Sequence, residues 1–233
     1  MKRRIQELWV AQFCLLKLII AALPLFPNLL GNYINLVESP LDTTRYLTAL
    51  ILLIDVALLR YLFAEELIAR KARSSSMRLS NWNAPNAGLF AVASVPALFV
   101  GIVLFGAPIF DSWLETLHLA MLLSVLGFVP FCLIHGQPVE ELLKFLQAME
   151  SDMSVEKLCF VPGLMAVVGA WCGSVVIPLD WDRPWQKWPI PCCYAAFVGY
   201  TLGHVGWLAA LWWKSCTKAA YARSNSKTDR FAD

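Results

Sequence analysis

The sequence has few charged residues for its length. Asp, Glu, Lys and Arg make up 15% of the 233 residues, whereas charged residues are about 25% of a typical soluble domain. Hydrophobic residues make up 58%. A water-soluble core of this length would not need so much apolar material, so the composition favours a membrane protein. The formal net charge of +2 predicts no nucleic-acid footprint.

The sequence also lacks the common signatures of enzymes. It has no P-loop, no GxSxG elbow and no HExxH. Its seven cysteines have no paired Cys or His motifs at ligand spacing, so we expect buried thiols. His118, His135 and His204 stand singly in or near apolar runs, which is typical of hydrogen bonding within helices. We therefore predict no catalytic centre, no metal site and no cofactor.

Long apolar segments make up most of the chain. A helix needs roughly 20 such residues to cross the hydrocarbon core of a bilayer. We expect six spans, at about 5–26, 46–69, 87–110, 113–134, 158–178 and 190–213. The first lacks a small-residue cleavage site before a soluble domain, so we expect a retained span. The sequence thus predicts an all-α, polytopic membrane protein with six transmembrane helices.

The connections between these segments differ in basic residues. With six spans both termini share one side, which would hold fourteen Lys and Arg residues against three on the other. The positive-inside rule then places both termini in the cytosol. Residues 136–157, with apolar residues at helical spacing, become a cytosolic amphipathic connection. Residues 179–189 become a lumenal Trp-rich loop, and 214–233 a basic cytosolic tail.

Two ionisable residues lie inside predicted spans. Asp55 in the second span is costly at membrane depth, and pairing with Lys17 of the first span or with a partner helix is the ordinary interpretation. A lipid or solute carrier that uses both residues in a midplane path is an alternative. Inverted internal repeats would support a carrier, and none is convincing here.

Small residues recur at four-residue spacing in the last two spans. Gly169 and Gly173 lie in the fifth, and Ala195, Gly199 and Gly203 lie in the sixth. Such stripes let helix backbones approach closely in a membrane. Two interpretations stay open: the two helices pack on each other, or they form a docking face for another protein.

The most specific feature is the stretch Trp171–Pro191, WCGSVVIPLDWDRPWQKWPIP. Its rigid prolines and large rings exceed what a turn needs and indicate a shaped surface. Asp180 and Asp182 could bind a divalent ion, but an ion pair with Arg183 and a helix cap for the next turn is the simpler interpretation. A membrane enzyme that acts on a lipid headgroup through these two aspartates and His204 is a second alternative.

The segment GAWCGSVVIPLDWDRPWQKWPIP, residues 169–191, closely resembles the signature of the PIG-F family of glycosylphosphatidylinositol (GPI) anchor biosynthesis proteins. Chain length, six spans and a glycine-bearing last helix with a basic tail agree with this family. The resemblance implies a multispanning endoplasmic reticulum protein without a catalytic centre of its own. It would bind and stabilise the ethanolamine phosphate transferases that add phosphoethanolamine to mannoses of the anchor precursor.

In this interpretation the glycine stripes and the loop contact the transferase. The predicted partner-binding residues are Gly169, Gly173, Asp180, Trp181, Asp182, Arg183, Pro184, Trp185, Gly199 and Gly203.

Overall fold

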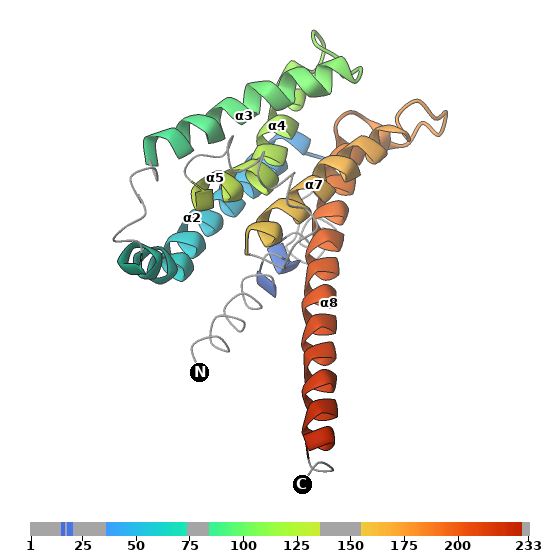
Figure 1. Cartoon of the computed structure of the whole chain (residues 1–233). Helices are drawn as coiled ribbons and strands as arrows, with labels where there is room; N and C mark the ends of the chain where they lie inside the picture. Colours follow the sequence, from blue (N-terminus) through green and yellow to red (C-terminus); the bar gives the residue numbers. More distant parts are fainter. Residues whose placement is uncertain (1–14, 17, 21–35, 74–83, 136–154, 230–233) are drawn as a thin grey trace.

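Helices form all the regular structure that can be described. The computed structural model describes residues 15–16, 18–20, 36–73, 84–135 and 155–229 (Figure 1). The longer elements are α2 (Pro40–Arg73), α3 (Ala84–Leu104), α4 (Trp113–Leu123), η5 (Ser124–Phe128), α5 (Val129–His135), α7 (Val155–Ser174), η6 (Pro184–Gln186) and α8 (Ile190–Asp229). No strand occurs in the described ranges. The predicted all-α fold is confirmed.

One helical run has both the length and the apolar composition to cross a membrane. Within the part of the chain that is described, this run is Trp113–Cys132, formed by α4, the π-helical turn η5 and most of α5. Shorter apolar stretches occupy Gly88–Leu104 of α3 and Phe160–Ser174 of α7. The six-span arrangement therefore stays a prediction. Most of the predicted span 5–26, and residues 136–154 of the amphipathic connection, lie outside the described residues.

The predicted third span, 87–110, extends too far, because α3 ends at Leu104. The chain turns at Gly106, whose φ is +102°. The Gly106 amide donates to the Val103 carbonyl at 2.9 Å, and the Ala107 amide donates to the Ile102 carbonyl at 3.3 Å. This pair of bonds is a Schellman motif, which closes a helix where glycine can adopt a left-handed conformation.

Other helix boundaries also differ from the predicted ones. α2 begins at Pro40, before the predicted 46, since proline at the first helical position gives up no hydrogen bond. α7 ends at Ser174, and the residues that follow it form turns. α8 continues through most of the predicted basic tail to Asp229.

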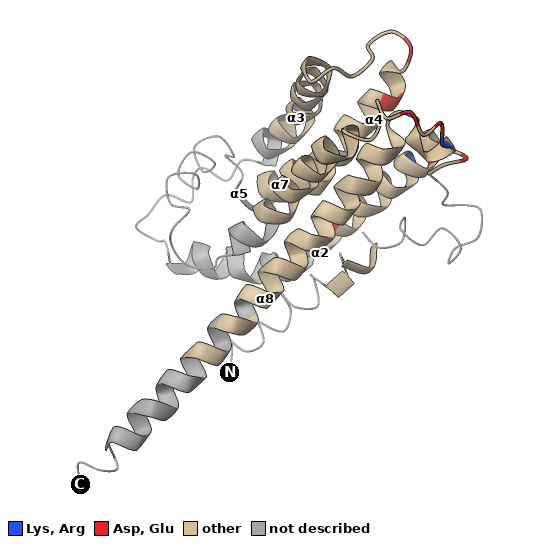
Figure 2. Cartoon of the chain, turned by 90° about the vertical axis from the view of Figure 1, so that its right-hand side faces the viewer, with Lys and Arg blue, Asp and Glu red and all other residues tan. Residues whose placement is uncertain are grey.

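The bundle buries an apolar core, and most charged residues whose side chains are described lie at one end. Fully buried core residues include Leu119, Leu122, Leu126, Ile190 and Phe197. Most of the charged residues that Figure 2 colours lie at the end of the bundle where α7 connects to α8. The C-terminal half of α8 extends away from that end (Figure 1). The described connections between α3 and α4 and between α7 and α8 thus lie at one end of the bundle.

Candidate partner-docking site

The connection between α7 and α8, residues 175–189, is a series of tight turns. Backbone bonds such as Ile177 N to Ser174 O at 3.1 Å and Trp181 N to Leu179 O at 2.9 Å hold its first half. Asp182 has a φ of +44°. Asp and Asn tolerate this left-handed region better than most residues, so the sequence suits the turn. The short 3-10 helix η6 and a cis Trp188–Pro189 bond then lead into α8.

The side chain of Gln186 forms hydrogen bonds with both halves of this loop. Its side-chain amide donates to the Val176 carbonyl at 2.7 Å and also to the Leu179 carbonyl. Its Oε1 accepts the Arg183 amide at 3.4 Å. Gln186 is buried, while its neighbours along the loop are largely exposed. Sequence reasoning missed this residue, although an uncharged amide among tryptophans and charges was a possible signal.

Trp188 ties the loop to the start of α4. Its indole Nε1 donates to Thr116 Oγ1 at 3.0 Å, and the Thr116 hydroxyl donates in turn to the Ser112 carbonyl at 2.9 Å. Thr116 is completely buried. A buried hydroxyl that both donates and accepts fixes the position of its partner. The loop is therefore held by a hydrogen bond to α4 as well as by those of Gln186 within the loop.

We expect Trp188→Phe to lower stability modestly. The change keeps most of the ring but removes the donor to Thr116, and such a bond contributes about 1 kcal/mol, or roughly 2–4 °C in Tm for a chain of this size. Thermal unfolding of the purified chain would measure the shift. Trp185→Phe is the matched control, because Trp185 lies on the exposed side of the same loop. An equal Tm for both variants and the wild type would contradict the role of this bond.

The predicted loop residues lie together on the outer surface. Asp180, Trp181, Asp182, Arg183, Pro184 and Trp185 are all exposed. The rings of Trp181 and Trp185 approach with centroids 5.9 Å apart, tilted by 59°. The two tryptophans therefore form one aromatic surface with charged groups around it. Such a surface, aromatic at its centre and polar at its rim, is common in protein interfaces.

The expected ion pair between Arg183 and the two aspartates is wrong. Among the described residues the structure places neither Asp180 nor Asp182 within ion-pair distance of Arg183, and the residue that precedes η6 is Arg183, not an aspartate. All three charged groups are exposed, and leaving such groups apart in solvent costs little. The bonds of Gln186, and not an ion pair of Arg183, connect the parts of the loop.

The four glycines lie in the contact between α7 and α8. A Cβ added at Gly173 would stand 2.5 Å from the Pro191 carbonyl oxygen, and one at Gly203 would stand 2.6 Å from the Pro162 Cα. A Cβ at Gly169 or Gly199 would collide with the backbone of the facing helix, at Ala195 or Met165 respectively. The structure thus shows the first of the two interpretations, in which the helices pack on each other.

A second glycine contact was missed from the sequence. A Cβ added at Gly127 in η5 would lie 3.2 Å from the Cα of Gly163 in α7, and one at Gly163 would collide with Gly127. Neither glycine belongs to a four-residue repeat within its own helix, so no stripe marked them. This contact brings the π-helical turn against α7.

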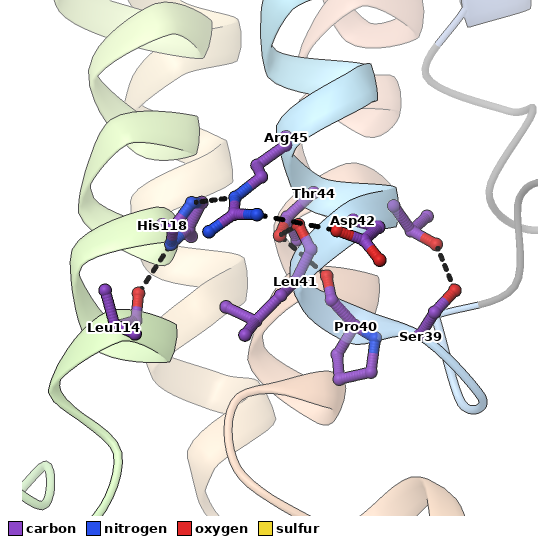
Figure 3. Close-up of polar contacts among 9 residues, drawn as sticks. Ser39, Pro40, Leu41, Asp42, Thr44, Arg45, Leu114 and His118 are labelled. Atoms are coloured by element: carbon purple, nitrogen blue, oxygen red, sulfur yellow. Dashed lines mark hydrogen bonds and ion pairs between the residues drawn. The ribbon is translucent and has the colours of Figure 1, made fainter.

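Arg45 and His118 connect α2 to α4 at the end where Trp188 contacts Thr116. Arg45 Nε donates to His118 Nε2 at 2.8 Å, and His118 Nδ1 contacts the Leu114 carbonyl at 2.6 Å (Figure 3). A nitrogen that accepts from arginine carries no proton, so Nδ1 is the donor and the imidazole is neutral. Asp42 lies 3.5 Å from the guanidinium. The sequence predicts Arg45 only as one of the three basic residues on the side opposite the termini.

The remaining predicted residues are dispersed. His204 is buried and contacts the Tyr200 carbonyl of its own helix at 3.0 Å, so the expected intrahelical hydrogen bonding is confirmed for His118 and His204. Asp55 is completely buried in α2, whereas Lys17 lies outside the described residues. Cysteine side chains are both buried (Cys132, Cys192, Cys193) and exposed (Cys172, Cys216). In the described ranges no three His, Cys, Asp or Glu residues are placed to hold a metal ion.

Comparison with known proteins gives consistent matches. The GPI biosynthesis protein family Pig-F matches residues 20–207. A human protein named GPI ethanolamine phosphate transferase, stabilizing subunit, is 27% identical over 205 residues, which cover 88% of this chain and 90% of that protein. A mouse protein of the same name is 32% identical over 157 residues, covering 67% and 70% respectively.

Fungal proteins match over a shorter region. Glycosylphosphatidylinositol anchor biosynthesis protein 11 of Debaryomyces hansenii is 39% identical over 115 residues, which cover 49% of this chain and 48% of that protein. This match therefore spans about half the length of each protein. No solved structure matches the chain significantly.

Proposed function

The chain belongs to the Pig-F family of GPI biosynthesis proteins, and we propose that it is a non-catalytic subunit that stabilises an ethanolamine phosphate transferase in the endoplasmic reticulum membrane. The observation that carries the proposal is the human relative, which aligns along 88% of this chain and is named as a stabilizing subunit of such a transferase. Transfer of phosphoethanolamine to mannoses of the anchor precursor would then be the chemistry of the partner.

We further propose the six-span arrangement, with both termini in the cytosol and residues 179–189 in the lumen. The outer surface of the described helices supports membrane embedding, because large apolar side chains are exposed there, among them Leu53 at 69% and Val92 at 70%. The α3–α4 and α7–α8 connections lie at one end of the bundle, opposite the C-terminal end of α8 (Figure 1). Helices that cross a membrane in alternating directions place every second connection on the same side, as these two connections are.

In this proposal the docking surface is the exposed face of the α7–α8 loop. Trp181 and Trp185 supply its aromatic centre, and Asp180, Asp182 and Arg183 supply charges around it. The four glycines act behind this surface, since they hold α7 and α8 together on both sides of the loop. The fold thus presents a loop whose two ends cannot separate, and a preorganised surface of this kind loses little entropy on binding.

Depletion of the chain tests the proposed function. Without its subunit the transferase would expose apolar surface in the membrane, so we expect its abundance to fall several-fold while its messenger RNA stays constant. Immunoblotting and analysis of phosphoethanolamine on GPI precursors would measure both effects. Normal transferase levels and normal precursors would overturn the proposal. Transfer activity of the purified chain alone, abolished by Asp180→Asn, would favour the membrane enzyme instead.

We expect Arg183→Ala to reduce the amount of co-purified transferase several-fold without lowering the yield of the chain. The guanidinium is exposed and makes no ion pair with a described residue, so its loss affects a partner more than the fold. Lys187→Ala is the control, since Lys187 is exposed on the same loop. Quantitative co-purification in mild detergent gives the ratio. Equal recovery with Arg183→Ala and the wild type would remove Arg183 from the docking surface.

A further inference from the structure

A cavity of about 380 Å³ lies between α3, the π-helical turn η5, α5 and α7. Its lining is almost entirely apolar and includes Phe90, Leu98, Phe131, Phe160 and Leu164. We propose that this cavity binds one acyl chain of a membrane lipid. The proposal rests on the membrane placement given above, and it assigns this side of the bundle a lipid-binding role apart from the docking loop.

The chemistry of the lining selects a ligand without polar groups. Among the described residues that line it, the one hydroxyl belongs to Ser94, whose Oγ lies 2.6 Å from Ser124 Oγ and donates to the Ala91 carbonyl at 2.7 Å. This hydroxyl is therefore satisfied within the protein. A buried water needs two to four polar partners, which the described lining does not offer. Hydrocarbon is the ligand that fits.

The length of the cavity suits one acyl chain of a lipid. Its lining runs along α3 from Phe90 to Leu98, which at 1.5 Å per residue is about 12 Å. Half of the hydrocarbon core is about 15 Å, so one acyl chain extends over a comparable length.

The cavity is also accessible from the surface that would face lipid. Phe90 and Leu164 line it and are themselves 37% and 48% exposed. Next to Phe90, Leu89 is 64% exposed, so apolar surface continues from the outside of α3 into the cavity. Gly127 and Gly163, whose backbones are in close contact, also line the cavity. An acyl chain can therefore enter sideways from the bilayer.

Photolabelling of the full chain, purified with its transferase and placed in lipid nanodiscs, tests the proposal. The probe is phosphatidylcholine with a diazirine on one acyl chain. We expect labelled peptides to concentrate in 90–98 and 160–167. Ala97→Phe should lower this labelling at least fivefold, because Ala97 lines the cavity and a phenyl ring would occupy it. Ala209→Phe is the matched control, since Ala209 is exposed on α8 and does not line the cavity.

The outcomes separate this proposal from the docking proposal. Labelling spread evenly over all exposed apolar helices in the wild type, or unchanged by Ala97→Phe, would overturn the acyl-chain site, and the wild-type result decides even if the variant fails to fold. Phosphatidylinositol with the same photoreactive chain is a second probe; equal labelling indicates recognition of the chain alone, and stronger labelling indicates that the headgroup adds to it. Labelling at the cavity in samples that retain no transferase would support the lipid site and count against the proposed function.

Discussion

Replacement of Gly199 by leucine is expected to abolish accumulation of the folded chain. A Cβ at this position collides with the Met165 carbonyl, which is backbone and cannot rotate away. The helices α7 and α8 would have to separate, and separation would break the neighbouring contacts at Gly173 and Gly203 as well. Even Gly199→Ala should cost about 1–3 kcal/mol, the usual range for overpacking a tight core.

The same helix supplies the control for this prediction. Gly206 lies further along α8 and is exposed, and a Cβ added there would have no atom within 4 Å, so Gly206→Leu should leave the chain folded. Both variants change a helical glycine to leucine, so differences in helix propensity cancel. Size-exclusion chromatography and thermal unfolding in detergent would compare them. Equal stability of the two variants would show that α7 and α8 do not need the close approach.

Part of this site is visible in the sequence. Four-residue spacing at Gly199 and Gly203 predicts close helix packing, because spacing reports which residues share a helix face. It does not say which surface covers that face. In the structure, α7 of the same chain covers that face. Gly127 and Gly163 escape notice because their contact joins single residues of two helices, and no repeat within either helix marks such a pair.

The helix boundaries and the loop, too, were predictable from the sequence only in part. Apolar composition locates the helices, but α3 ends where Gly106 adopts a positive φ, which hydropathy does not register. In the loop, Arg183 and Asp182 draw attention because they are charged. The neutral side-chain amide of Gln186 makes the connecting hydrogen bonds instead. The sequence does not predict this, because it does not show which backbone carbonyls lack a donor in the folded chain.

Substitution of Gln186 should therefore disable the docking loop more than any change of its charged residues. Gln186→Glu keeps the shape of the side chain but removes the donor that serves the carbonyls of Val176 and Leu179, and it places a negative charge against them. An unmet buried group costs about 1–3 kcal/mol. A loss of about 2 kcal/mol in the order of the loop lowers the equilibrium constant for the competent conformation roughly thirtyfold.

Two measurements would test Gln186, and they would fail together if its role is wrong. In sealed vesicles with the loop exposed, limited proteolysis should cleave Gln186→Glu within 175–189 much faster than wild type, and co-purified transferase should fall more than tenfold, on the scale of the lost loop order. Lys187→Ala is the control for a substitution at the neighbouring position, because the Lys187 side chain is exposed while that of Gln186 is buried. A protease-resistant loop with full transferase recovery in Gln186→Glu would mean that the turns on the α7 side hold the surface without the amide. Rapid cleavage with full recovery would mean instead that the transferase orders the loop when it binds, so that the surface forms on docking and is not preorganised.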